Sequence, residues 1–277
     1  MDFSEAVSNY VRRFPLDQLD ARATCLFEGL PWGKKPFSFN VLGTYLNQSN
    51  DNASKAKHQI RDEISLLRDN EVLLDRLSMI DVGCGVGLHA EEMSSWFKGE
   101  YLGCDINPSA VEYAEQQSWP LNFKFICEDF FTFTISKKFD VVFAAYDFVN
   151  HLSVEKLRLF LSRCDSLLSE KGVIVLEVAS NSSILNKHEL KYTYFKDLCS
   201  REIAEETFFS ASKGIWGSRY FLPCDNNRIE NVFYNFRRNL TLDEILISLQ
   251  DYKIVFESNL NKRQSGDVYG KFIAFQK

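Results

Sequence analysis

The sequence predicts an α/β protein whose core is a seven-stranded, mostly parallel sheet with helices on both faces. Three observations lead to this fold class. After Ser78, short apolar runs alternate with amphipathic stretches, a pattern typical of parallel strands joined by helical crossovers. A glycine-rich turn, Gly83 to Gly87, follows the first apolar run. Two more apolar runs close the chain and complete the set of strands.

Size and composition limit the function. The 277 residues are 45% hydrophobic, enough to bury a sizeable core. The net charge of −6 provides no overall positive field for nucleic acid or an acidic membrane. No apolar run reaches the ~18 residues of a membrane span, and the start of the chain lacks the apolar stretch of a signal peptide. Seven cysteines occur singly, so we expect no metal site and a cytoplasmic location.

Residues 1–78 are expected to form a helical cap. Two apolar stripes have helical spacing, and they are separated by the proline- and glycine-containing loop "GLPWGKKPFSFN". The members of the two stripes are Val7, Tyr10, Val11 and Phe14, then Ile60, Ile64, Leu67 and Leu74.

The core is expected over residues 79–180 and 241–277. Helices are expected over 87–97 and 108–117, where Pro108 suits the first helical position. Ser153 is a predicted N-cap, and Thr241 with Glu244 forms a predicted capping box. The expected strands, in order, are "SMIDV", "EYLGCD", "NFKFIC", "KFDVVFAAY", "KGVIVLEV", "YKIVFES" and "KFIAFQK".

The stretch 181–240 interrupts the core after its fifth strand. It contains the aromatic-rich runs "ETFFSAS", "IWGSRYFL" and "NVFYNF", and in the last of these apolar residues alternate with period two. We therefore expect a small antiparallel insertion that acts as a lid over a substrate.

The glycine-rich turn predicts a ligand close to the backbone at the carboxyl edge of the sheet. A phosphate-binding P-loop would need a Gly-Lys-Ser/Thr ending, which is missing. A dinucleotide site would have its third glycine where Leu88 stands, and Asp81 would repel a pyrophosphate. Asp81 instead suits a ligand that carries positive charge, and a dehydrogenase is therefore disfavoured.

Four successive motifs carry a family resemblance. "IDVGCGVG", "GCDINPSAVEYA", "ICEDFF" and "FDVVFAAYDFVNHL" resemble, in order and spacing, the motifs of class I S-adenosylmethionine-dependent methyltransferases. The resemblance covers residues 79–178 and the last two strands. It implies a Rossmann-like fold, S-adenosyl-L-methionine as the cofactor and S-adenosyl-L-homocysteine as the product.

The resemblance also implies which residues contact the cofactor. The glycines would let the backbone approach its methionyl and ribose parts, and Asp81 would interact with its amino-acid end. Asp105 would accept hydrogen bonds from the ribose hydroxyls, and Asp129 would bind the adenine amino group. Each acid also has a structural alternative, as a helix cap or a turn residue. The full set is Asp81, Gly83, Gly85, Gly87, Asp105, Ile106, Asp129 and Phe130.

In the family, the segment after strand four, "YDFVNHLS" here, faces the transferred methyl group. His151 is the candidate general base because its ordinary pKa lies near neutrality, although a polar cap or a packing residue is the alternative. Asn150 and Tyr146 are further candidate catalytic residues. Substrate binding is assigned to Asp147, Tyr194 and Trp216, and no partner acids suggest a metal at Asp147.

The cap and the inserted sheet resemble those of small-molecule N- and O-methyltransferases. The expected activity is therefore methyl transfer to nitrogen or oxygen of a metabolite or natural product by in-line displacement. Alternatives are a nucleic-acid or protein methyltransferase and a non-catalytic cofactor-binding protein of the same fold. No membrane partner is expected, nucleic acid is disfavoured, and a homodimer stays open.

Overall fold

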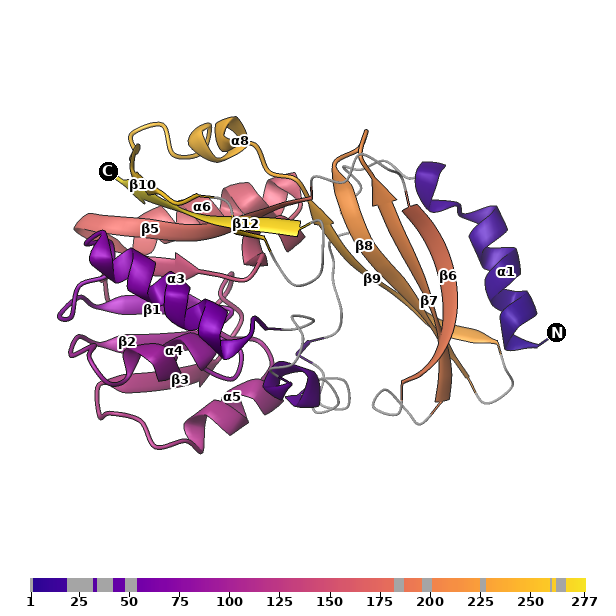
Figure 1. Ribbon diagram of the computed structural model, residues 1–277, viewed down its shortest axis with the longest axis horizontal. Coiled ribbons are helices and arrows are strands. Elements are labelled where there is room, and N and C mark those ends of the chain that lie inside the picture. Colours follow the sequence, from indigo (N-terminus) through magenta and orange to yellow (C-terminus); the bar gives the residue numbers. More distant parts are fainter. Residues whose placement is uncertain are drawn as a thin grey trace.

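A computed structural model gives the architecture of the chain (Figure 1). The structure describes residues 2–18, 32–33, 42–47, 54–181, 187–195, 201–224, 228–259, 261–262 and 268–277. They form a core built on one large sheet and, beside it, a second sheet covered by the N-terminal helix.

Seven strands of the large sheet follow the order β10-β12-β5-β4-β1-β2-β3, with the short β11 paired to β12. The neighbouring strands β5, β4, β1, β2 and β3 pair in parallel, whereas β12 runs antiparallel to both of its neighbours, β5 and β10. The predicted α/β fold class is confirmed. The strands are β1 (Met79–Val82), β2 (Tyr101–Asp105), β3 (Phe123–Cys127), β4 (Phe139–Ala144), β5 (Leu168–Asn181), β10 (Lys253–Glu257), β11 (Asn261–Lys262) and β12 (Val268–Gln276).

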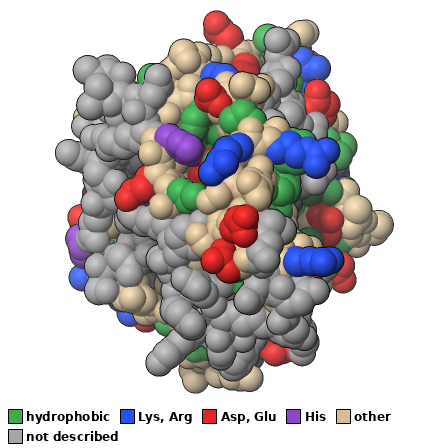
Figure 2. Space-filling model, turned by 90° about the vertical axis from the view of Figure 1, so that its right-hand side faces the viewer, with side chains coloured by type: hydrophobic (Ala, Val, Ile, Leu, Met, Phe, Trp, Pro, Cys, Tyr) green, Lys and Arg blue, Asp and Glu red, His purple; other side chains and the backbone are tan. Residues whose placement is uncertain are grey.

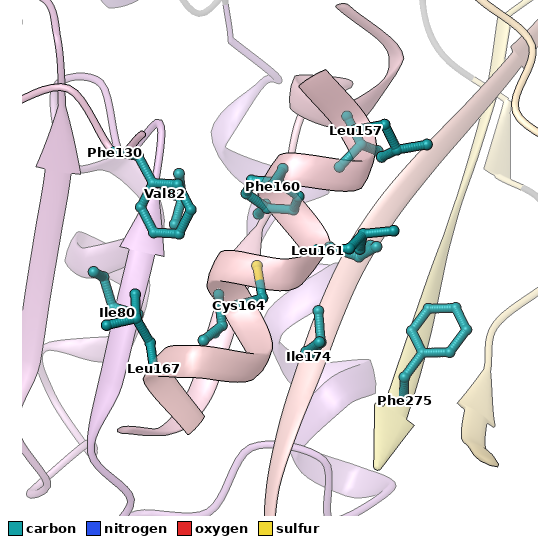
Figure 3. Close-up of a cluster of buried hydrophobic side chains, with 14 of the residues drawn as sticks. Ile80, Val82, Phe130, Leu157, Phe160, Leu161, Cys164, Leu167, Ile174 and Phe275 are labelled. Carbon is teal, nitrogen blue, oxygen red and sulfur yellow. The ribbon is translucent and has the colours of Figure 1, made fainter. Parts of the chain in front are cut away.

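Helices cover both faces of this sheet because each buries one apolar stripe against it. One face packs against α3 (Lys57–Asp69), α4 (Leu88–Met93) and α5 (Pro108–Glu115). The other face packs against α6 (Val154–Leu167) and α8 (Leu242–Leu246). Figure 3 shows how Phe160, Leu161 and Cys164 of α6 point toward Ile80, Val82 and Ile174 of the strands.

Local signals in the sequence fix the starts of three helices. The Ser153 side chain accepts a hydrogen bond from the backbone N–H of Lys156, and Pro108 occupies the first turn of α5. Thr241 and Glu244 form the expected capping box at α8. These three predicted helix starts are confirmed.

The insertion after β5 is an antiparallel sheet in the order β6-β7-β8-β9, as expected. Its strands are β6 (Lys187–Phe195), β7 (Arg201–Ser210), β8 (Ile215–Pro223) and β9 (Ile229–Arg238). Alternation along the strands gives it two faces. One face is covered by α1 (Phe3–Arg13) and the short helix η1 (Leu16–Gln18), which place Val7 on Phe221 and Leu16 on Phe208.

The N-terminal helices lie in two different places. α1 packs on the second sheet at one end of the molecule, whereas α3 packs on the core beside α4 (Figure 1). The expected loop "GLPWGKKPFSFN" lies outside the described residues except for residues 32–33. The boundaries of the cap at 1–78, the core and the lid at 181–240 stay predictions.

Within the described ranges, no helix combines the length and the apolar character that a bilayer span requires.

Candidate active site

The glycine-rich turn joins β1 to α4 at the carboxyl edge of the sheet. Gly83, Gly85 and Gly87 all have positive φ, at 76°, 54° and 84°. Any other residue would be strained there, and a Cβ on Gly83 would lie 2.9 Å from the ring of Phe148. A Cβ on Gly85 would lie 3.2 Å from the ring of Tyr45. The glycines therefore permit close packing by the protein's own rings as well as a sharp turn.

Asp105 ends β2 next to this turn. Its Oδ2 accepts a 2.8 Å hydrogen bond from the backbone N–H of Gly85, and its Oδ1 accepts another of 2.8 Å from Asn107. The first bond ties the glycine turn to the neighbouring strand. Each carboxylate oxygen can accept about two hydrogen bonds, so both keep acceptor capacity for a ligand. The helix-capping role belongs to Asn107, whose Oδ1 accepts from the N–H groups of Ser109 and Ala110.

Asp81 is buried within β1, below the turn. Its Oδ2 accepts a 2.6 Å hydrogen bond from the hydroxyl of Tyr101. Burial raises the pKa of Asp81 to about 7, against the lowering effect of the Tyr101 hydrogen bond. Burial also raises the pKa of Asp105, although the backbone N–H groups that it accepts from act in the opposite direction. The site thus holds two carboxyl groups that a nearby positive charge would stabilise in their ionised form.

The other expected cofactor residues differ in their surroundings. Ile106 is 46% exposed at the end of β2, an apolar surface left open beside Asp105. The Oδ1 of Asp129 accepts a 2.9 Å hydrogen bond from the backbone N–H of Phe131, as a turn residue does. Phe130 is buried in the core against Phe160 (Figure 3). Ile106 and Asp129 therefore lie at the sheet edge, whereas Phe130 is part of the hydrophobic core.

The turn after β4 is held in a strained conformation. Tyr146 and Asp147 have left-handed φ values of 52° and 63°, which cost energy in residues other than glycine. The backbone N–H of Tyr146 donates a 2.6 Å hydrogen bond to Glu177 of β5. The buried Asp147 accepts a 3.0 Å hydrogen bond from Arg237 of β9. The core and the second sheet together hold this turn in place.

Asn150 and His151 lie in the helical turn η3 (Phe148–His151). Asn150 is fully buried, and its amide donates to the carbonyls of Ala179 and Arg238 at 2.7 and 2.8 Å. Its Oδ1 accepts from the N–H of Ala179 at 2.9 Å. Both amide hydrogens are therefore used to join β5 to β9. The neighbouring His151 is half-buried.

Trp216 lies at the junction of the two sheets, buried against Ala179 of β5 and Phe209 of β7. Its ring therefore serves the packing of the second sheet on the core. The side chain of Tyr194, the other expected aromatic contact, lies outside the described residues.

Three residues near the site, Tyr45, Lys55 and Glu177, were not expected from the sequence. The ring of Tyr45 lies against Gly85, so close that a Cβ added to this glycine would be 3.2 Å from the ring. Lys55 is buried and bonds Glu63 as well as Glu177, the latter at 2.7 Å. No local motif marks these residues, because they come from segments far apart in the sequence. A single charged residue, Glu177, inside the otherwise apolar run "GVIVLEV" was the one available signal.

Comparison with known proteins indicates the class of domain to which part of this sheet belongs. Residues 79–172 match the family model described as "Methyltransferase domain". No curated protein sequence matches the chain. Residues 79–172 are therefore similar to a methyltransferase domain, in agreement with the resemblance of the four motifs to the S-adenosylmethionine-dependent class.

Solved structures share the fold at low sequence identity. The CcbJ methyltransferase from Streptomyces caelestis is 11% identical with a TM-score of 0.60, covering 86% of this chain and 97% of that one. CalS10, an amino pentose methyltransferase from Micromonospora echinaspora, is 18% identical with a TM-score of 0.55, covering 85% and 95%. An S-adenosylmethionine-dependent methyltransferase from Clostridium acetobutylicum is 15% identical with a TM-score of 0.52, covering 98% of both chains.

Proposed function

We propose that the protein transfers the methyl group of S-adenosyl-L-methionine to a nitrogen or oxygen of a small-molecule acceptor. The observation that carries the proposal is Asp105, a half-buried carboxylate that is bonded to the glycine turn and keeps acceptor capacity toward a ligand. The proposal agrees with CalS10, which is described as an amino pentose methyltransferase bound to S-adenosylmethionine.

The residues present fit this cofactor. Asp105 would accept hydrogen bonds from the ribose, and the exposed Ile106 would pack on the adenine ring. When bound, S-adenosylmethionine supplies an activated methyl group on a positively charged sulfur. The acidic surroundings of the turn, Asp81 and Asp105, suit that charge better than a pyrophosphate. The positive charge of nearby Lys55 is paired with Glu63 and Glu177.

The protein's own contribution is alignment and proton removal. The strained turn at Tyr146 and Asp147 places η3 beside the glycine turn, with Phe148 against Gly83. A hydroxyl acceptor must lose its proton as its oxygen forms the new bond to carbon, whereas an ammonium acceptor must lose one first, because only the neutral amine has a lone pair. His151 is the proposed base, because an imidazole accepts that proton near neutral pH.

A nucleic-acid acceptor is disfavoured by charge. The end of the molecule that carries α1 and the second sheet shows acidic and basic side chains interspersed among its described residues (Figure 2). The net charge of −6 also provides no overall positive field that would attract phosphates.

Calorimetry with S-adenosylmethionine, followed by mass analysis of a metabolite extract incubated with labelled cofactor, tests the proposal. We expect binding and a labelled small product. His151→Ala should lower kcat by roughly 10²–10⁴ while cofactor affinity stays nearly unchanged. His58→Ala, which replaces an exposed histidine of α3, is the matched control and should keep full activity. Binding with no labelled product would instead indicate a non-catalytic binding protein.

A further inference from the structure

The two faces of the second sheet differ in chemistry. The outer face, under α1 and η1, buries the apolar side chains of Ala204, Phe208, Phe221 and Phe236 around an ion pair between Glu206 and Arg219. The inner face is turned toward the core (Figure 1). On that face, Trp216 packs on Ala179 of β5, and the Arg237 side chain bonds Asp147 of the catalytic turn.

The register of the strands arranges the inner face in rows. Alternate residues of a strand share a face, and successive rows lie about 7 Å apart. The row that docks on the core is followed by a row of three hydrogen-bonding side chains and then by a row with one carboxylate and two rings. The three rows are Phe209, Trp216 and Arg237; Thr207, Ser218 and Asn235; and Glu205, Tyr220 and Phe233.

Five polar side chains of the second and third rows form a continuous set, here called the polar ladder: Glu205, Thr207, Ser218, Tyr220 and Asn235. The Ser218 hydroxyl donates to Glu205 at 2.7 Å, and the hydroxyls of Thr207 and Ser218 are 3.3 Å apart. Ser218 is buried and the other four are half-buried. A sheet face that served only to meet water would leave such side chains exposed.

The chemistry of the ladder points to a particular acceptor. It offers hydroxyl, carboxamide and carboxylate groups beside the rings of Tyr220 and Phe233. Burial beside Glu205 raises the pKa of Tyr220 well above its ordinary value, so its hydroxyl stays neutral and can donate or accept. An aromatic acceptor would offer these side chains few hydrogen bonds beyond those that they make with one another, whereas a hydroxyl-rich acceptor would offer several.

We propose that the polar ladder binds a hydroxyl-rich ring of the sugar kind and presents its nucleophilic nitrogen or oxygen to the turn at residues 146–151. This inference rests on the proposed methyl transfer and specifies its acceptor class. Arg237 supports the placement: it lies two residues from Asn235 on the same face and bonds the turn itself.

The test uses the full-length protein with labelled S-adenosylmethionine and two sets of probes. The first set holds neutral and amino pentoses and hexoses, each as the free sugar and as its methyl glycoside. The second set holds tyramine and catechol. We expect labelled product from members of the sugar set and little from the aromatic set. The two sugar forms show whether the ring is recognised alone or as part of a larger molecule.

Variants connect the specificity to the ladder. Glu205→Gln and Ser218→Ala should each raise the KM for the best sugar at least tenfold, while the Kd for S-adenosylmethionine changes less than twofold. A site built to hydrogen-bond a hydroxyl should also reject the corresponding deoxy sugar strongly. Glu230→Gln is the matched control, because Glu230 is an exposed carboxylate on β9 of the same sheet, and it should leave KM unchanged.

The possible outcomes separate the two proposals. If the parent protein does not bind S-adenosylmethionine, the proposed function is wrong and this inference is wrong with it. Cofactor binding with transfer only to the aromatic probes, or to no sugar, overturns the polar ladder alone. Unchanged KM values in both ladder variants would do the same.

Discussion

At the scale of single residues, Asp105 decides whether the glycine turn can hold a ribose. Asp105→Ala removes the acceptor of two backbone N–H groups and of the expected ribose hydroxyls, and each lost hydrogen bond to a buried group costs about 1–3 kcal/mol. We expect the Kd for S-adenosylmethionine to rise at least tenfold in calorimetry. Asp62→Ala, an exposed aspartate on α3, is the control. Equal affinity of the Asp105 variant and the parent would refute the ribose assignment.

Asp81 predicts a pH dependence of stability. Burial raises its folded-state pKa to about 7, whereas the unfolded chain has the ordinary value near 3.8. Between these two values the folded state holds a proton that the unfolded state has lost. Stability from this group is therefore present at low pH and decreases as pH rises toward 7, by at most about 1.4 kcal/mol per pKa unit.

Asp81→Asn removes this titration and keeps an oxygen that can accept from Tyr101. We expect the difference in Tm between the variant and the parent to grow in favour of the variant as pH rises from 5 to 8. Thermal unfolding across that range measures it, with Asp62→Asn as the control. A difference that is independent of pH would show that Asp81 does not titrate in the folded protein.

The positions of the glycine turn and of Asp105 were predictable from the sequence, whereas contacts between distant segments were not. The glycines and Asp105 follow from local spacing, because the turn and the strand end that position them are continuous in sequence. The contact between Tyr45 and Gly85 could not be predicted. It joins two separate segments, and only the tertiary fold brings them together.

At the scale of elements, the turn from Tyr146 to His151 links the core to the second sheet. The sequence motif indicates that this segment lies at the site, but it does not distinguish the roles of adjacent residues. Asn150 donates its amide hydrogens to the carbonyls of Ala179 and Arg238. These partners could not be predicted from local motifs, since they lie 29 and 88 residues away along the chain. We therefore interpret Asn150 as a positioning residue for His151.

The ion pair of Arg237 with Asp147 is a second interaction that joins this turn to the second sheet. Arg237→Met would leave the carboxylate of Asp147, which is 1% exposed, without that partner. Because Arg237 is itself 19% exposed, we expect a loss of about 1–3 kcal/mol rather than the full cost of a buried pair. Denaturant unfolding measures the loss, and the exposed Arg158→Met is the control.

A double-mutant cycle with Asp147→Asn tests whether the two residues act together. We expect a coupling free energy of about 1 kcal/mol or more, because each single variant already breaks the interaction. The Arg237 variant should also raise the KM of the acceptor, since it loosens the turn against the second sheet. Strictly additive effects on stability would show that the pair contributes nothing.

At the scale of the whole molecule, the order of elements was more predictable than their mutual placement. Apolar runs and caps predict the strands and helices because both depend on local chemistry. The N-terminal region was expected as one cap, yet α1 lies on the outer face of the second sheet and α3 on the core. An amphipathic stripe specifies that a helix is buried on one side, but not which surface it covers.

The segment leading into α3 is joined to the site by buried charges. Lys55 bonds Glu63 of its own helix region and Glu177 of β5, and Glu177 accepts from the turn at Tyr146. Ser54, next to Lys55, donates a 2.9 Å hydrogen bond to the carbonyl of Tyr45. This network connects Tyr45, which covers Gly85, to the turn at Tyr146.

Lys55→Met therefore tests the architecture as a whole. It leaves two buried carboxylates without their shared cation, which should destabilise the protein by about 3–5 kcal/mol and weaken S-adenosylmethionine binding, because Tyr45 and Tyr146 lose a common support. Denaturant unfolding and calorimetry measure the two effects. Lys57→Met is the matched control: its pair with Glu91 is about half-exposed, and such pairs contribute about 0–1 kcal/mol.

The triple variant Lys55→Met, Glu63→Gln, Glu177→Gln removes the uncompensated charges and retains an acceptor for Tyr146, so it should recover most of the stability. If Lys55→Met is no more destabilising than Lys57→Met, the buried charges do not hold the N-terminal segment on the site.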